Sequence, residues 1–113
     1  MVMIPTERRI AQDYDRVRKE IYADRDIENK FRTRIVDFMT FCQAAGLPAP
    51  TKYSKEDNGW FFEWVNAYTH MSVTINAAGR MRMLYVECAH ISNFKLWVLP
   101  LVSAVNTFRL AGP

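Results

Sequence analysis

The sequence has few of the residues from which disulfide frameworks and phosphate-binding loops are built. It contains two cysteines and four glycines in 113 residues. Two cysteines are too few for a disulfide scaffold, so we expect Cys42 and Cys88 to be reduced. The glycines are scattered and form no glycine-rich loop. The apolar runs are too short to cross a bilayer, and the first residues lack the pattern of a signal peptide, so we expect a cytoplasmic protein.

Apolar side chains, in contrast, are abundant. Half of the residues are hydrophobic and 13% are aromatic, a composition that argues against disorder. At this length we predict a single domain, residues 1–113, with a core of its own. The formal net charge of +3 is mild, so the composition permits an acidic partner without requiring one.

The clearest pattern runs from Asn58 to Cys88, where apolar and polar residues alternate in three short stretches. An alternation with period two is typical of strands that have one buried face. Asparagine, alanine and glycine between the stretches predict tight reversals, so we expect a three-stranded antiparallel meander. The face to be covered carries Trp60, Phe62, Trp64, Val73, Ile75 and Tyr85, and the face toward water carries Phe61, Val65, Leu84 and Val86.

We expect helices before and after the meander in the sequence. Residues 6–45 contain no glycine or proline, and apolar residues recur there three or four positions apart. Polar residues at 23–26 interrupt this stripe, so we favour two helices over one long bent helix. Two prolines predict an extended connector over residues 47–57, residues 89–99 fit a strand or a helix, and Pro100 suits the first turn of a closing helix. The predicted class is α+β: two N-terminal helices, three strands and a C-terminal helix.

Residues 35–87 contain a series of short motifs. These are Gly46-Leu47-Pro48-Ala49-Pro50 at the end of the second helix, then Gly59, Glu63-Trp64 and Gly79. In these motifs the segment resembles a recurring type of small bacterial and phage protein, with a helix ending in GLPxP, a loop and a three-stranded meander closing its first strand on Glu-Trp. The charged helix before Ile35 departs from that pattern. The resemblance implies a helix-plus-meander fold and a phage or prophage origin, and it implies no activity.

No catalytic or metal-binding constellation is visible, so we expect no enzymatic activity, no metal and no cofactor. Cys42, Cys88, His70 and His90 lack the paired spacings of zinc sites. Nothing in the sequence brings either cysteine to a histidine, as a nucleophile and its base require. Glu63 is more simply interpreted as a member of a cross-strand pair or a turn than as an acid–base group.

The surplus of apolar residues indicates an interaction protein. Phe61, Val65, Leu84, Val86 and Trp97 are the residues that would mark a surface for a protein partner or for self-association. We therefore predict a small, non-enzymatic, phage-type protein that acts by binding a host protein, in the host cytoplasm. An anti-defence or host-takeover inhibitor is one concrete form of this prediction.

The alternative is a nucleic-acid-binding accessory protein. Its candidate phosphate contacts are Arg32, Arg34, Arg80 and Arg82. Acidic residues interleave with the arginines of the helices, however, and this arrangement is typical of a solvated face with ion pairs. A segregated basic surface would favour the alternative, and an open apolar surface would favour the interaction protein.

Overall fold

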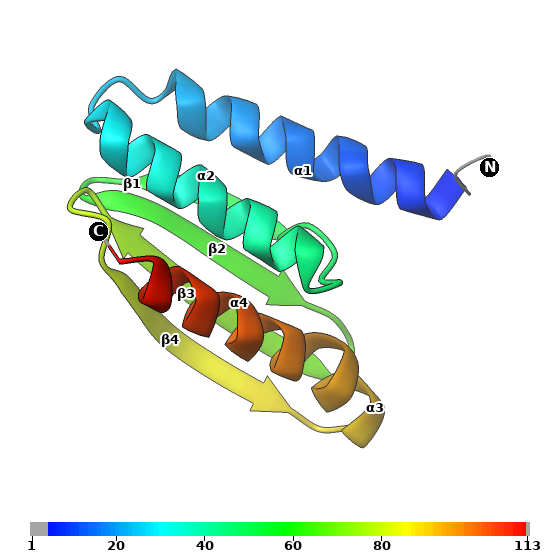
Figure 1. Ribbon diagram of the computed structural model, residues 1–113. Coiled ribbons are helices and arrows are strands. Elements are labelled where there is room, and N and C mark those ends of the chain that lie inside the picture. The colour runs from blue at the N-terminus through cyan, green and yellow to red at the C-terminus, as the bar shows by residue number, and fades with distance from the viewer. Residues whose placement is uncertain (1–4, 113) are drawn as a thin grey trace.

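The structure is an α+β fold in which the helices lie on one face of a four-stranded antiparallel sheet (Figure 1). The computed structural model describes residues 5–112, with side chains from Glu7 onward. The first six elements are α1 (Pro5–Ala23), α2 (Asn29–Ala44), β1 (Lys52–Glu56), β2 (Gly59–Val65), β3 (Thr69–Asn76) and β4 (Met81–Cys88). The helical segment that follows is made of α3 (Ile91–Asn93), a π-helical turn (Phe94–Val98) and α4 (Leu99–Ala111). The predicted class is confirmed, and the sheet has one strand more than predicted.

Two separate helices, rather than one bent helix, precede the sheet. The break covers residues 24–28 and so includes most of the stretch 23–26 at which the stripe is interrupted. Asp24 fixes the loop locally, because its Oδ1 accepts a hydrogen bond from the amide of Asp26 at 3.0 Å. Nη1 of Arg32 donates to the main-chain carbonyl of Asp24 at 2.8 Å, which ties the loop to the first turn of α2.

The side chain of Asp24 joins this loop to the sheet. It is 1% exposed, and its Oδ1 lies 2.9 Å from Nζ of Lys55 on β1. Its Oδ2 accepts from Nε1 of Trp60 on β2 at 2.9 Å. Burial by itself raises the pKa of Asp24, but hydrogen bonds from Lys55, the Asp26 amide and Trp60 outweigh burial and hold the pKa below its ordinary value of 3.8. The ionised carboxylate therefore clamps the loop against the first two strands.

The sheet has the order β1-β2-β3-β4, and each strand is antiparallel to its neighbour. β1 corrects the prediction of three strands, because it lies inside the segment expected to be an extended connector. A two-residue turn at Asp57-Asn58 pairs Glu56 with Gly59 and so joins β1 to β2. β1 is an edge strand in which four of five residues are exposed, so it lacks the apolar alternation by which the other strands are found.

A β-bulge in β4 changes which residues face the helices. The pairing register shifts between Ser72 and Val73 and leaves Leu84 without a partner on β3. The alternation predicted from the sequence is therefore inverted beyond the bulge. Tyr85, predicted on the covered face, lies on the open face and is 44% exposed. Val86, predicted on the open face, lies on the helix side at the edge of the sheet, where it is still 45% exposed.

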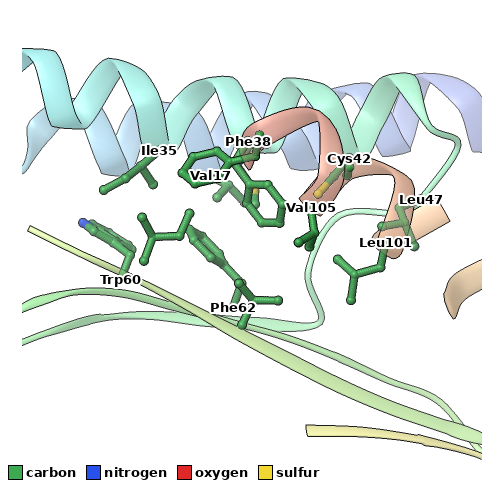
Figure 2. Close-up of a cluster of buried hydrophobic side chains, with 14 of the residues drawn as sticks. Val17, Ile35, Phe38, Cys42, Leu47, Trp60, Phe62, Leu101 and Val105 are labelled. Atoms are coloured by element: carbon green, nitrogen blue, oxygen red, sulfur yellow. The ribbon is translucent and has the colours of Figure 1, made fainter. Parts of the chain in front are cut away.

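The core fills the space between the sheet and the helices. Trp60, Phe62 and Trp64 of β2 are at most 5% exposed, so this predicted face is covered as expected. Figure 2 shows Trp60 and Phe62 pointing from the sheet toward Ile35 and Phe38 of α2. The rings of Phe38 and Phe62 have centroids 6.3 Å apart in a tilted arrangement. Burial of these large apolar groups is the dominant force that holds α2 on the sheet.

The C-terminal helical segment begins earlier than predicted. Pro100 does lie in the first turn of α4, but helical backbone already begins at Ile91. The intervening π-helical turn ends with a bond from the amide of Leu99 to the carbonyl of Phe94. Pro100 has no amide hydrogen and interrupts the regular ladder, so a wider turn directly before it fits the chain.

Candidate interaction surface

β4 is the open edge of the sheet. It pairs with β3 along one side, and five of its eight residues are exposed. The other edge, β1, is only five residues long, follows two prolines and carries Lys52 and Lys55. Short, charged edges resist pairing with a further strand, whereas a long apolar edge presents unpaired backbone groups to one. Of the two edges, β4 is the one suited to contact another chain.

Most of the exposed apolar residues belong to the last third of the sequence, on both faces of β4 and along the helical segment that follows it. Twelve large apolar side chains of the described chain are exposed, and nine of them belong to β4 or to the helical segment after it. These nine are Leu84, Tyr85, Val86, Ile91, Phe94, Leu96, Leu99, Val102 and Leu110. We call them the C-terminal apolar surface. An uneven distribution of this kind marks a contact region more clearly than scattered apolar residues do.

The structure separates the five residues predicted to contact a partner. Leu84 and Val86 are 47% and 45% exposed and belong to the C-terminal apolar surface. Phe61 and Val65 lie on β2, on the open face of the sheet, and β3 separates them from β4. Trp97 is partly buried and packs against the core. The first two are therefore placed beside the open edge, and the other three are not.

The four arginines of the nucleic-acid alternative have different environments. Arg32 is 8% exposed and binds the α1–α2 loop, so its guanidinium is not presented to a ligand. Arg34 is partly buried, whereas Arg80 and Arg82 are exposed. Arg82 belongs to β4, and Arg34 and Arg80 line a common hollow. The structure thus brings together two of the four arginines.

A polar cluster occupies the open face of the sheet. Nε2 of His70 lies 2.7 Å from Oε2 of Glu63, which makes Glu63 half of a cross-strand pair. The ring of His70 also packs on Tyr85 with centroids 4.8 Å apart. The hydroxyl of Tyr85 donates to Glu87, and this hydrogen bond raises the pKa of Tyr85. Ser72 stands between Glu63 and Tyr85, and its hydroxyl makes no hydrogen bond to His70 among the described residues.

The cysteines lie in unlike surroundings. Cys42 is fully buried, and burial raises the pKa of its thiol well above the ordinary value. Cys88 donates to the main-chain carbonyl of His90 at 3.2 Å, while the ring of His90 packs on Tyr68 instead. Across residues 5–112, no three side chains of His, Cys, Asp or Glu form a group that could hold a metal ion. Within the same range, no helix has both the length and the apolar character that a membrane crossing requires.

Comparisons of the chain with protein-family models, with curated proteins and with solved structures found no match. The surface is therefore interpreted from the residues and geometry of this chain alone.

Sequence reasoning missed several residues of the exposed surface. Ile91, Phe94 and Leu99 lie in the segment that fits a strand or a helix, and Val102 lies in the predicted closing helix, yet all four are exposed. A helical pattern shows which residues share a face, but it does not show how much of that face the sheet covers. The signal that could have found them is the high density of apolar residues after residue 90, which exceeds what one packed helix face needs.

Proposed function

We propose that this chain is a non-enzymatic interaction protein that binds a protein partner along the open edge of β4. The observation that carries this proposal is the C-terminal apolar surface, which holds nine of the twelve exposed large apolar residues. A partner strand would pair with the backbone groups that β4 leaves free, and the apolar side chains beside the edge would be buried in the contact.

The partner is a protein of the bacterial host, and the chain is of the phage or prophage type. This part of the proposal is supported by the resemblance of residues 35–87 to small bacterial and phage proteins. An anti-defence or host-takeover inhibitor would act in this way, by occupying a surface of its target. Aromatic and aliphatic anchors such as Phe94 and Leu84 would lie at the centre of the contact, with Arg82 and Glu87 at its rim.

The test combines capture from nuclease-treated bacterial lysate with light scattering of the purified protein. The test variant carries Leu84→Lys and Val86→Lys, which place two charges beside the open edge. The control is Tyr22→Lys, because Tyr22 is equally exposed, at 46%, but lies on α1. Circular dichroism verifies that all three proteins are folded.

The expected result is one protein that the wild type and the Tyr22→Lys control retain in a fixed ratio and the edge variant loses. A dimer of the purified chain that the edge variant converts to a monomer would also support β4 as the contact, with a second copy as the partner. Retention by all three proteins would refute the proposed edge, as would a monomer that captures no protein.

A further inference from the structure

A second region of the molecule, between the start of β4 and the end of α4, has the features of a ligand site. A hollow of about 730 Å³ lies where the turn between β3 and β4 meets α2 and α4. Figure 1 shows this turn, the beginning of α2 and the end of α4 together at one end of the molecule. Pockets for small ligands span about 300–1,000 Å³, so the hollow is of the size that a small molecule needs.

The charges that line the hollow are all positive. Lys30, Arg34, Arg80 and Arg109 contribute to it, and no carboxylate side chain of the described residues does. The nearest acidic neighbours stand outside. Glu28 is exposed and 4.0 Å from Lys30, and Asp37 lines the adjoining smaller hollow. The four cations come from α2, from the β3–β4 turn and from α4, so the fold gathers charges that are far apart in the sequence.

Arg34 is held rigidly at the wall of this hollow. Its Nε donates to the carbonyl of Gly79 at 2.9 Å, and its Nη1 donates to the carbonyls of Phe108 and Gly112. Its guanidinium carbon lies 3.7 Å from the centroid of the Phe108 ring. Nη2 makes no hydrogen bond to a described residue, so two donors stay available. A guanidinium fixed in this manner can bind an anion without losing side-chain freedom.

Among the described residues, no salt bridge joins Arg34, Arg80 or Arg109 to a carboxylate. Partial burial lowers the pKa of Arg34, and the charge of Asp37 opposes this shift. A partly buried charge without a counter-ion is unfavourable, and a bound anion would supply the missing charge.

One apolar part of the wall, beside Phe108 and Met81, is the phenyl ring of Phe31. Phe31 lines the hollow beside Arg34 and is partly buried, with Nζ of Lys30 5.0 Å from its ring centroid. Gly79 permits the turn to approach this wall. A Cβ at position 79 would lie 2.9 Å from Cδ of Arg34 and 3.1 Å from Cδ1 of Phe31. The close approach brings Arg80, the next residue of the turn, to the hollow that Arg34 and Phe31 line.

From this geometry we propose that the hollow binds a nucleotide, with its phosphate held by Arg34, Arg80 and Arg109 and its base lying on Phe31. Clustered cations supply the charge-assisted hydrogen bonds that a phosphate takes, and an aromatic side chain provides a platform on which any base can stack. The ligand is a free nucleotide or the terminal nucleotide of a single strand. The residues that line the hollow include none of the C-terminal apolar surface, which is proposed to contact the protein partner.

Calorimetric titration of the full chain separates the two halves of the ligand. The probes are AMP, inorganic phosphate (phosphate without a base) and adenosine (a base without phosphate). AMP is expected to bind more tightly than either of the others. Equal affinity for AMP and inorganic phosphate would overturn the contact with Phe31, and equal affinity for AMP and adenosine would overturn the contact with the cations. Absence of saturable binding of AMP and of both oligonucleotides described below would overturn the site as a whole.

Two variants test the residues. Arg80→Gln with Arg109→Gln removes two exposed cations, and we expect AMP to bind about tenfold more weakly or worse. The control, Arg8→Gln with Lys19→Gln, makes the same change of net charge on α1 and should bind as the wild type does. Phe31→Leu should weaken the binding of AMP and leave the binding of inorganic phosphate unchanged. Equal losses in the cation variant and its control, or equal losses of both probes in Phe31→Leu, would refute the assignment.

A single-stranded oligonucleotide with and without a terminal phosphate identifies the source of the nucleotide. Tighter binding of the phosphorylated strand than of AMP would assign the site to a strand end, and the reverse order would assign it to a free nucleotide. Tighter binding of the unphosphorylated strand than of the phosphorylated one would contradict the proposal. The β4 variant Leu84→Lys with Val86→Lys should bind all of these probes as the wild type does, so failure of one proposal is distinguishable from failure of the other.

Discussion

Replacing Asp24 by asparagine tests whether one buried carboxylate holds the helices to the sheet. Asparagine has nearly the same shape but carries no charge, and it replaces one acceptor oxygen by a donor. In the wild type the carboxylate accepts from Trp60 at 2.9 Å and from the Asp26 amide at 3.0 Å while Lys55 neutralises it. The single carbonyl oxygen of asparagine leaves at least one of these donors without its acceptor.

The expected cost follows from the burial of the group. Hydrogen bonds to a charged partner contribute about 1.5–3 kcal/mol, and a buried donor left unsatisfied costs about 1–3 kcal/mol. Because asparagine retains one of the two contacts, we expect Asp24→Asn to lower the free energy of unfolding by about 2–3 kcal/mol. For a chain of this length, such a loss lowers the melting temperature by roughly 10 °C.

Asp26 provides the matched control. It also pairs with Lys55, but its side chain is 78% exposed, so water replaces the lost contact. Asp26→Asn should therefore change the free energy of unfolding by about 0.5 kcal/mol or less. Urea denaturation followed by tryptophan fluorescence and circular dichroism measures both variants. Equal effects of the two substitutions would refute the reasoning, because burial would then not decide the outcome.

Because the Asp24 carboxylate is ionised in the fold, we also expect the free energy of unfolding to depend on pH. Folding lowers the pKa of Asp24 below its ordinary value of 3.8, so the ionised form stabilises the fold. That contribution is fully present above the ordinary pKa and is lost as the pH falls through the lower pKa of the folded state. The difference in stability between wild type and Asp24→Asn should thus be constant from neutral pH to about pH 5 and shrink as the solution becomes more acidic than the ordinary pKa. A difference that stays constant at low pH would show that charge is not involved.

Three further substitutions test close packing and one buried hydroxyl. Gly59→Ala would place a Cβ 2.0 Å from the carbonyl oxygen of Ile75 at a φ of +134°, and we expect a loss of about 3 kcal/mol or more in urea denaturation. Gly46→Ala, at a φ of +92° with open space around the Cβ, should cost about 1 kcal/mol, and a similar cost at both positions would contradict the clash. Tyr14→Phe removes a buried hydroxyl that donates to the carbonyls of Leu47 and Pro48, and it should cost about 1 kcal/mol. An unchanged denaturation midpoint in Tyr14→Phe would show that these carbonyls do not need the hydroxyl.

The strands of the core could be predicted because their side chains alternate cleanly. Trp60, Phe62 and Trp64 are separated by residues that stay partly exposed, so the pattern and the burial agree. β1 escaped prediction because it lies at an edge, where hydrogen bonding to β2 and not apolar burial defines the strand. The bulge at Leu84 could not be predicted for a different reason. Residues 83–86 are apolar on both faces, so either register buries a similar side chain.

The ligand hollow shows what local patterns leave out. Arg34 and Arg80 are predicted phosphate contacts because of their charge alone, whereas Lys30 and Arg109 are not among the predicted contacts. At the wall of the hollow the carbonyl of Gly79 accepts from Arg34, a contact between residues 45 positions apart. Periodicity along the chain contains no information about such a contact, since it depends on where the β3–β4 turn comes to rest on α2.

The unlike edges of the sheet set a limit on how large an assembly of this protein can grow. A strand added at β4 extends the sheet in one direction, and growth in the other direction would need a strand at β1. β1 is short and charged, and its inward side chains are engaged with α1 and the loop after it, through Tyr53 to Glu20 and Lys55 to Asp24. A second copy joined edge to edge at β4 would thus form a closed pair with β1 at both ends, and a different partner would form a complex of one to one. The architecture that permits an open apolar edge thereby prevents it from starting a fibre.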